Sequence, residues 1–285
     1  MNRLTCLVAA TAAAASIAAL GATSAATAST RPGNAAVAAA AARAALRYVT
    51  ANPPATNQPV PGTRASVQGP TRLLSGNWSG YANDDSKGNA YSKVSAGWTE
   101  PAVTCPTKED QLAAFWVGID GLTSSKVEQD GTLAQCYEGK AYYYTWWEMY
   151  PTNNIQVVGG TVKPGDKIAA SVVKTGTRYA LKVTDSTTSG NNVSTTQTCS
   201  ASACIDSSAE WIGEAPGGSR GEYPLADFKT WAVSSASVTS GTKTGTIKTF
   251  PDDEITMESD TYALATPGAL NSAGTGFTDT WDNSY

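Results

Sequence analysis

The sequence predicts an all-β domain, a sandwich or a barrel, on three observations. Short runs of alternating polar and apolar residues follow one another from about residue 73 to the end. Gly, Asn, Asp, Ser and Thr separate these runs, and no window of this region has a convincing helical period. Many short strands at close spacing are typical of a single all-β domain.

Each predicted strand is a run of this kind, bounded by turn-forming residues. The runs are residues 91–100, 113–119, 141–150, 167–174, 178–185, 207–214, 228–240, 245–250 and 254–259.

Residues 1–28 predict a secretory signal peptide. Arg3 gives a positive start, residues 4–20 are apolar and rich in alanine, and residues 26–28 form a small-x-small cleavage site. The apolar stretch is too short and too weakly hydrophobic for a good membrane span, and no later stretch could cross a membrane. We therefore expect an exported, extracellular protein without a membrane partner.

Residues 29–72 predict either a pro-segment with a linker or a disordered spacer. Residues 35–49 have a strong helix propensity, and residues 53–72 are a proline-rich linker. The segment holds almost no large apolar side chains, so it cannot build a core of its own. A folded domain is expected over residues 73–285, where all 8 tryptophans lie.

Charge separates these two parts of the chain. Residues 29–72 carry five arginines and no carboxylate, whereas residues 73–285 hold 14 basic and all 24 acidic residues. The acidic domain argues against a nucleic-acid partner. The opposite signs predict that the leader, as we call residues 29–72, docks over an acidic groove and inhibits it, unless it is merely a spacer.

The cysteine and histidine content limits which catalytic and metal sites the chain can form. The cysteines outside the signal peptide allow three pairings, and the short loop between Cys199 and Cys204 favours Cys199–Cys204 with Cys105–Cys136. Disulfide bonds suit an exported protein better than a zinc site does. The chain has 0 histidines, which excludes Ser-His-Asp and Cys-His catalysis as well as histidine metal ligands.

Strand alternation places carboxylates beside aromatic side chains. In an extended TWWEMYP stretch, Trp146, Glu148 and Tyr150 share one face, which suits a binding groove. In AEWIGE, Glu210 and Glu214 share a face. Solvated glutamates on an edge strand are the alternative interpretation.

Several segments in order resemble the glutamic peptidases, the eqolisin family. They are NWSGY (77–81), FWVGIDG (115–121), VEQDG (127–131), WWEMYP (146–151) and AEWIGE (209–214). The resemblance covers roughly residues 77–265. It implies a two-sheet antiparallel β-sandwich similar to the legume lectins, a concanavalin A-like jelly roll, with the active site on a concave sheet.

The resemblance also implies roles for individual residues. Glu214 matches the catalytic glutamate of the family and Gln129 its catalytic glutamine. Asp120 and Glu148 match carboxylates that line the site. Trp78, Trp146 and Tyr150 match aromatic residues of the substrate groove. Taken alone, Gln129 would be assigned to a surface loop, and Asp120 to a turn.

Glu214 and Gln129 together could hydrolyse a peptide bond without metal or cofactor. A carboxylate can deprotonate water and then protonate the leaving nitrogen, while an amide N–H₂ group stabilises the oxyanion. Such a base predicts an acidic working pH, since an ordinary glutamate has a pKa of about 4.3. The sequence therefore predicts a monomeric, secreted acid endopeptidase acting on polypeptides.

Two other functions remain open on the residues alone. A glycoside hydrolase would use Glu148 and Glu214 as its carboxylate pair. A carbohydrate-binding module would stack sugars on Trp146 and Tyr150. Substitution of Gln129 distinguishes the peptidase, because a glycosidase need not depend on that position.

Overall fold

The computed structural model describes residues 34–51, 58–59, 70–85, 90–158, 162–200 and 202–284. The predicted signal peptide and most of the predicted linker lie outside them. None of the helices in these ranges is long and apolar enough to span a membrane.

The described residues fold almost entirely as strands, apart from α1 (Asn34–Ala45) and two short 3₁₀ helices, η1 (Leu46–Tyr48) and η2 (Ile247–Thr249). The strands are β1 (Gln58–Pro59), β2 (Thr71–Ser75), β3 (Trp78–Asp84), β4 (Tyr91–Thr99), β5 (Gln111–Ile119), β6 (Val127–Tyr137), β7 (Lys140–Tyr150), β8 (Gln156–Val158), β9 (Lys167–Thr175), β10 (Arg178–Asp185), β11 (Val193–Thr198), β12 (Ser208–Glu214), β13 (Gly217–Gly218), β14 (Gly221–Glu222), β15 (Thr230–Ser240), β16 (Lys243–Gly245), β17 (Asp252–Glu258), β18 (Ala263–Pro267) and β19 (Thr278–Trp281).

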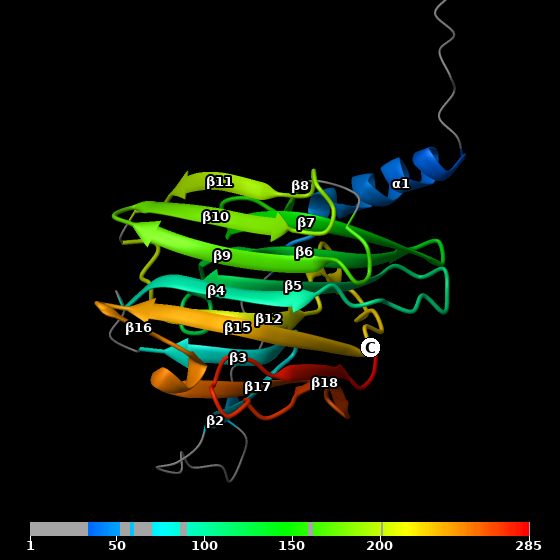
Figure 1. Cartoon of the computed structure of the whole chain (residues 1–285). Helices are drawn as coiled ribbons and strands as arrows, with labels where there is room; N and C mark the ends of the chain where they lie inside the picture. The colour runs from blue at the N-terminus through cyan, green and yellow to red at the C-terminus, as the bar shows by residue number, and fades with distance from the viewer. Residues whose placement is uncertain are drawn as a thin grey trace, which may run out of the picture.

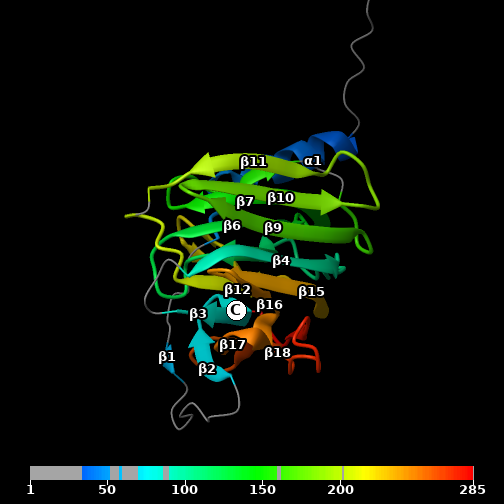
Figure 2. The ribbon, with the colours of Figure 1, turned by 60° about the vertical axis from the view of Figure 1, so that its left-hand side comes forward.

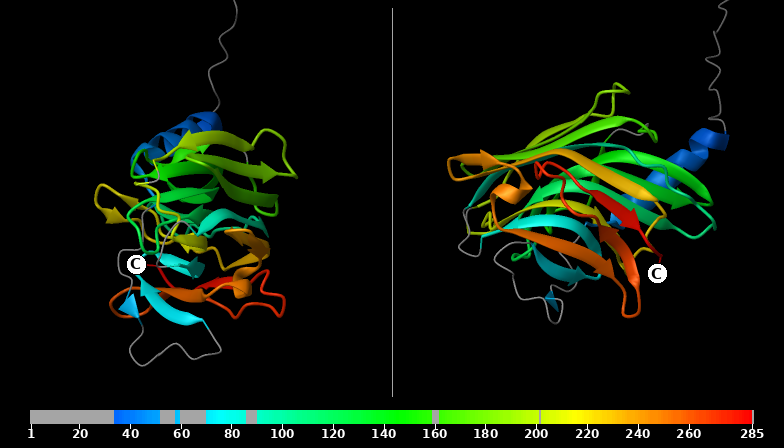
Figure 3. Two further views of the ribbon diagram at one scale, coloured as in Figure 1. Left: turned by 90° about the vertical axis from the view of Figure 1, so that its left-hand side faces the viewer. Right: turned by 60° about the horizontal axis from the view of Figure 1, so that its bottom comes forward.

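Strand pairing arranges most of these strands in two curved layers (Figures 1 and 2). One layer, here called the site sheet, has the order β8–β7–β6–β5–β12–β3–β17–β2, and all its neighbours are antiparallel except β17 and β2. The other layer, the back sheet, has the order β11–β10–β9–β4–β15–β16. Strands β18 and β19 connect β17 to β15 at one side. Figure 3 shows the layers from two further directions. The predicted two-sheet sandwich is confirmed.

The main core lies between the two sheets and follows from strand alternation. On β5, Phe115 and Val117 point into this core, and on β12 Trp211 does the same. Phe115 packs against Trp231 of β15 at a ring distance of 5.3 Å. The residues between them on the same strands therefore face the opposite side of the site sheet.

A second apolar cluster covers that opposite side of the site sheet. It contains Trp78, Trp116, Trp146 and Ile212 from the sheet, together with Leu46, Val49 and Ala51 from the leader. In Figures 1 and 2, α1 lies at the end of the molecule near β7 and β11. Residues 46–51 of the leader thus complete a cluster that the sheet begins.

Most strand predictions are confirmed, and two disagree with the structure. Residues 245–250 were expected to form a strand, but only Gly245 belongs to one, β16, and residues 247–249 form η2, where Thr246 and Thr249 make a capping box. Gln129 was assigned to a loop by its local sequence, yet it lies within β6 and is fully buried. The predicted disulfide bonds Cys105–Cys136 and Cys199–Cys204 are both formed.

Candidate active site

Four strands, β7, β6, β12 and β3, bring five of the predicted site residues to one face of the site sheet: Trp78, Gln129, Trp146, Glu148 and Glu214. This face is the one that carries the second apolar cluster, which includes Trp78 and Trp146. The alternation expected in β7 is confirmed, since Trp147 and Met149 pack toward the main core instead. Glu148 lies on the strand between Trp147 and Met149 and therefore faces the site.

Glu214 is the last residue of β12 and is fully buried. The indole Nε1 of Trp116 donates a hydrogen bond to its Oε2 at 2.8 Å. The amide Nδ2 of Asn77 donates to Oε1 at 3.4 Å. Both donors are neutral groups, so they fix the direction of the carboxylate without adding a counter-charge.

The indole of Trp116 is held in place by its neighbours on the sheet. Trp78 meets it edge to face at a ring-centroid distance of 4.9 Å. A Cβ atom on Gly118 would lie only 2.7 Å from Cζ3 of Trp116. The ring fits at this position because Gly118 has no side chain. A rigid indole gives the hydrogen bond to Glu214 a defined geometry.

Gln129 and Glu148 face each other across β6 and β7 as register partners. The amide Nε2 of Gln129 donates to Oε2 of Glu148 at 3.1 Å and to the carbonyl oxygen of Ala51 at 2.7 Å. Oε2 of Glu148 also accepts from the backbone N–H of Ala51 at 2.9 Å. Among the described residues, Oε1 of Gln129 and Oε1 of Glu148 have no partner.

Burial raises the pKa of Glu148 well above its ordinary value, and the nearby charge of Glu214 raises it further. The hydrogen bonds from Ala51 and Gln129 act in the opposite direction. Two carboxyl groups that interact in this way do not ionise together easily. The geometry therefore favours a protonated Glu148 at acidic pH beside Glu214.

Asp120 takes part in a different set of contacts. Its carboxylate accepts hydrogen bonds from the backbone N–H groups of Asp206 and Ser207, both at 2.9 Å, and so ties two loops together. This contact suits the turn interpretation, because Asp120 has a φ of 68°. Its predicted contact with substrate stays a prediction.

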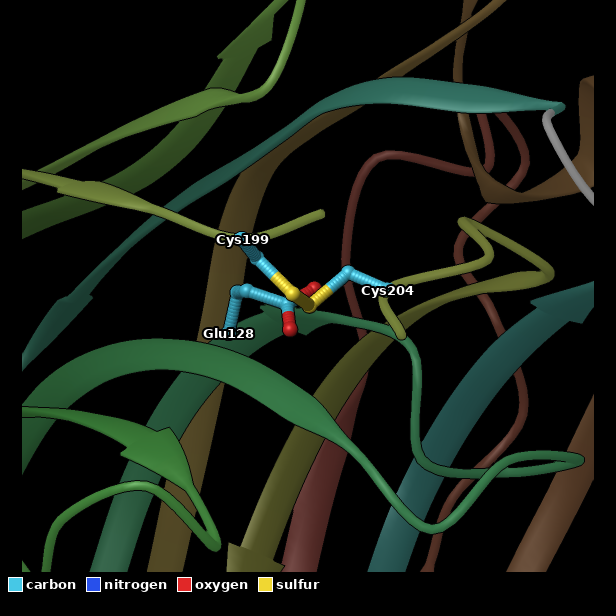
Figure 4. A group of neighbouring side chains, drawn as sticks. All are labelled: Glu128, Cys199 and Cys204. Atoms are coloured by element: carbon cyan, nitrogen blue, oxygen red, sulfur yellow. A yellow bond between two sulfur atoms is a disulfide. The ribbon is translucent and has the colours of Figure 1, made fainter. Parts of the chain in front are cut away.

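Near Asp120, the side chain of Glu128 points toward the disulfide bond Cys199–Cys204 (Figure 4). Carboxylate oxygens of Asp120, Glu128 and Asp206 lie within 4.8 Å of one another, close enough to share an ion. Lys174 and Tyr179, however, already bond to Asp206. The disulfide sulfurs are not thiolates and could not hold a metal.

Sequence reasoning missed two residues that shape this site, Trp116 and Asn77. Each stands in a motif that carried the resemblance, FWVGIDG or NWSGY. Alternation could have placed Trp116 on the site face, but nothing local to the sequence pairs β5 with β12. Contact of Ala51 with Gln129 and Glu148 was not foreseen either, because the leader was expected to dock through its charge.

Three comparisons with known proteins found relatives of this chain. A family model described as the peptidase A4 family matches residues 76–274. Aspergillopepsin-2 of Aspergillus niger is 27% identical over 190 residues, which are 60% of this chain and 66% of that protein. The chain thus spans slightly less than two thirds of this curated relative.

Two solved structures share the fold. Scytalido-glutamic peptidase, determined with a peptide-based transition-state analogue, has a TM-score of 0.61 and 23% identity over 73% of this chain and 98% of its own. Aspergilloglutamic peptidase from Aspergillus niger has a TM-score of 0.53 and 28% identity over 60% of this chain and 99% of its own. Both matches bear on the two-sheet architecture described above.

Proposed function

Because the chain belongs to the peptidase A4 family, we propose that it is a secreted acid endopeptidase that hydrolyses polypeptides with Glu214 and Gln129. The resemblance to the glutamic peptidases is confirmed by the same match.

The observation that carries the proposal is the contact between Gln129 and a peptide group. Its amide Nε2 donates to the carbonyl oxygen of Ala51 at 2.7 Å. The same donor would polarise the carbonyl of a substrate and then stabilise the oxyanion that forms from it. One such donor contributes about 3–4 kcal/mol to transition-state stabilisation in characterised enzymes.

Glu214 is the proposed general base. In its ionised form it takes a proton from a water molecule, and the water oxygen attacks the carbonyl carbon. The protonated Glu214 then gives its proton to the leaving nitrogen, so that an acid and an amine are released without a covalent intermediate. Trp116 and Asn77 hold the carboxylate toward the reacting water.

Glu148 is proposed to position the substrate and Gln129. Its Oε2 accepts from Gln129 and from a backbone N–H group at the same time. A substrate peptide would present its own N–H group to this oxygen. Trp78, Trp146 and Tyr150 would contact the substrate side chains nearby, as the sequence predicts.

Glycoside hydrolysis remains the second candidate by residue type, since Glu148 and Glu214 would be its pair. The contacts of this face favour the peptidase, because main-chain N–H and C=O groups of Ala51 are what Glu148 and Gln129 bind. An amide that binds a peptide carbonyl has no evident part in cleaving a glycosidic bond.

Casein hydrolysis from about pH 2 to about pH 8 tests the proposal, with a chelator and with pepstatin in parallel samples. We expect activity on the acidic side, near the ordinary pKa of a glutamate at about 4.3, and no effect of either inhibitor. Activity that peaks above neutral pH, or that the chelator abolishes, would contradict the Glu214–Gln129 mechanism.

The leader is proposed to inhibit the enzyme until it is removed. Leu46, Val49 and Ala51 are buried in the cluster that covers the site. Arg43 adds a hydrogen bond from Nη2 to the carbonyl oxygen of Val157 at 2.7 Å. Apolar burial and main-chain bonds thus accompany the charge attraction that the sequence predicts.

A further inference from the structure

The outer face of the back sheet is basic, although residues 73–285 as a whole are acidic. Figure 1 shows the strands of this sheet, β11, β10, β9, β4, β15 and β16, side by side. Within these described strands, Asp185 is the only carboxylate. It is buried, and it accepts hydrogen bonds from the backbone N–H groups of Thr187 and Thr188 in the turn after β10. The strands therefore present no carboxylate on the outer face.

Strand alternation directs basic side chains onto this face. On β10, the residues at positions 179, 181 and 183 are buried in the main core, so Arg178 and Lys182 lie on the outer face. The same alternation places Lys93 of β4 and Lys167 of β9 there. Lys93, Arg178 and Lys182 have no ion-pair partner among the described residues. Their charges are thus available to a negatively charged partner.

A hollow of about 490 Å³ lies on the middle strands of this face, β10, β9, β4 and β15. Both Lys93 and Lys182 line it. Most of the other lining residues are small or carry a hydroxyl group, among them Ser95, Gly97, Ala169, Ser171 and Thr184. In the strand register the two lysines are two strands and two residues apart, which corresponds to roughly 12 Å between their Cα atoms. An extended polymer could lie in this hollow between two positive charges.

The same face lacks the groups on which nucleic acids and proteins usually depend for binding. Duplex DNA carries one charge per about 1.7 Å, far more densely than these cations are spaced. All aromatic residues of these strands are buried in the main core, so none is left to stack on a base. The exposed large apolar side chains of the described residues, Val37 and Tyr262, lie elsewhere, so the face has no anchor of the kind found at protein interfaces.

We propose that the outer face of the back sheet binds an anionic polysaccharide. Lys93, Arg178 and Lys182 would contact its carboxylate groups, and the hydroxyl side chains of the hollow would exchange hydrogen bonds with its sugar hydroxyl groups. This inference goes beyond the proposed function and does not depend on it. Because the main core separates this face from the site sheet, a bound protein would direct its candidate active site away from the polymer.

Equilibrium binding of the full chain to polygalacturonate tests the proposal at about pH 6, where uronate groups are ionised. We expect binding in dilute buffer that weakens as salt is added, because exposed charges are screened. Dextran, a neutral polysaccharide, should not bind. The triple variant Lys93→Gln, Arg178→Gln, Lys182→Gln should lose affinity for polygalacturonate by about tenfold or more, since each exposed ion pair contributes a factor of about two to five.

The matched control removes the same number of lysines and arginines at exposed positions outside the back sheet: Lys108→Gln, Lys140→Gln and Arg220→Gln. Its net charge equals that of the first variant, and both keep the arginines of the leader. We expect its affinity to stay within about twofold of the wild type.

A second measurement does not depend on the folding of a variant. In the wild-type chain, bound polygalacturonate should protect Lys93 and Lys182 from acetylation. Lys108 and Lys140 should react as they do in the free protein.

Several outcomes would overturn the proposal. They are an absence of binding, equal losses in the two triple variants, unprotected Lys93 and Lys182, and equally tight binding of dextran. Tighter binding of duplex DNA through the same three residues would identify a nucleic acid as the partner instead. If the wild-type chain forms dimers that the first variant does not form, the face is an interface between copies of the chain. Casein hydrolysis tests the proposed function separately, so it can stand or fail independently of this face.

Discussion

Asp279 gives the clearest prediction of how acidity acts on this fold. It lies on β19 and is fully buried. Oδ1 accepts a hydrogen bond from Oγ of Ser79 at 2.6 Å, whereas Oδ2 has no partner among the described residues. Burial raises the pKa of Asp279 from 3.8 to about 7. A difference of about 3 in pKa corresponds to about 4 kcal/mol.

The direction of the pH effect on stability follows from comparing the pKa of Asp279 in the folded and the unfolded chain. Since the folded pKa is the higher one, the stability that Asp279 contributes is fully present below about pH 4. It is lost as the pH rises through about 7, because the folded chain must then bury a charge. Asp279→Asn is nearly isosteric and cannot ionise. Between acidic and alkaline pH, the free energy of unfolding of the Asp279→Asn chain should therefore rise by about 4 kcal/mol relative to that of the wild type.

Urea unfolding near pH 3.5 and near pH 8 measures this difference. Both chains should carry Glu214→Gln, so that self-digestion does not disturb the equilibrium. Asp260→Asn is the matched control, because it makes the same change at an exposed position and should leave the pH dependence unchanged. An equal loss of stability with pH in the Asp279→Asn chain and in its parent would refute the reasoning.

Other predictions concern the site, the disulfide bond and the leader. Trp116→Phe removes the indole donor to the proposed base and should lower kcat about tenfold, because hydrogen bonds to charged groups contribute about 1.5–3 kcal/mol. The circular dichroism spectrum should not change. An unchanged kcat would contradict this role. Replacing both Cys105 and Cys136 by Ala opens a loop with a sequence separation of 31 and should lower the free energy of unfolding by about 3–4 kcal/mol in urea titrations; a loss below about 1 kcal/mol would refute that role. A synthetic peptide of residues 29–72 should inhibit casein hydrolysis by the isolated domain, and added salt should weaken this inhibition. Val49→Asp in the peptide should weaken the inhibition strongly. Equal inhibition by both peptides would exclude the apolar contact.

Much of the fold could be predicted from local pattern. Alternation identified β4, β7, β9, β10, β12 and β15, and the short loop between Cys199 and Cys204 identified the disulfide bonds. The strand β6 was missed, because Glu128, Gln129 and Asp130 stand together in it and suggest a loop. These side chains are buried on both faces of the sheet, so neither face shows the usual alternation of polar and apolar residues.

The strand faces of the site residues could be predicted from the sequence, but the contacts between strands could not. Glu214 and Glu148 could be assigned to a binding face, because the period of a strand is two residues. The sequence gives no register between strands, so the bond from Trp116 to Glu214 could not be foreseen. The position of Ala51 depends on a contact across 78 residues, from the leader to Gln129 on β6.

Turnover of the Glu214→Gln chain tests the central claim most directly. With the leader removed, its kcat on casein at acidic pH should fall by about 10²–10⁴, the usual contribution of general acid–base catalysis, while the fold persists. Glu210→Gln is the matched control, four residues earlier on β12 and equally buried; it should keep most of its activity. Wild-type turnover in Glu214→Gln, or an equal loss in Glu210→Gln, would contradict the assignment of the base.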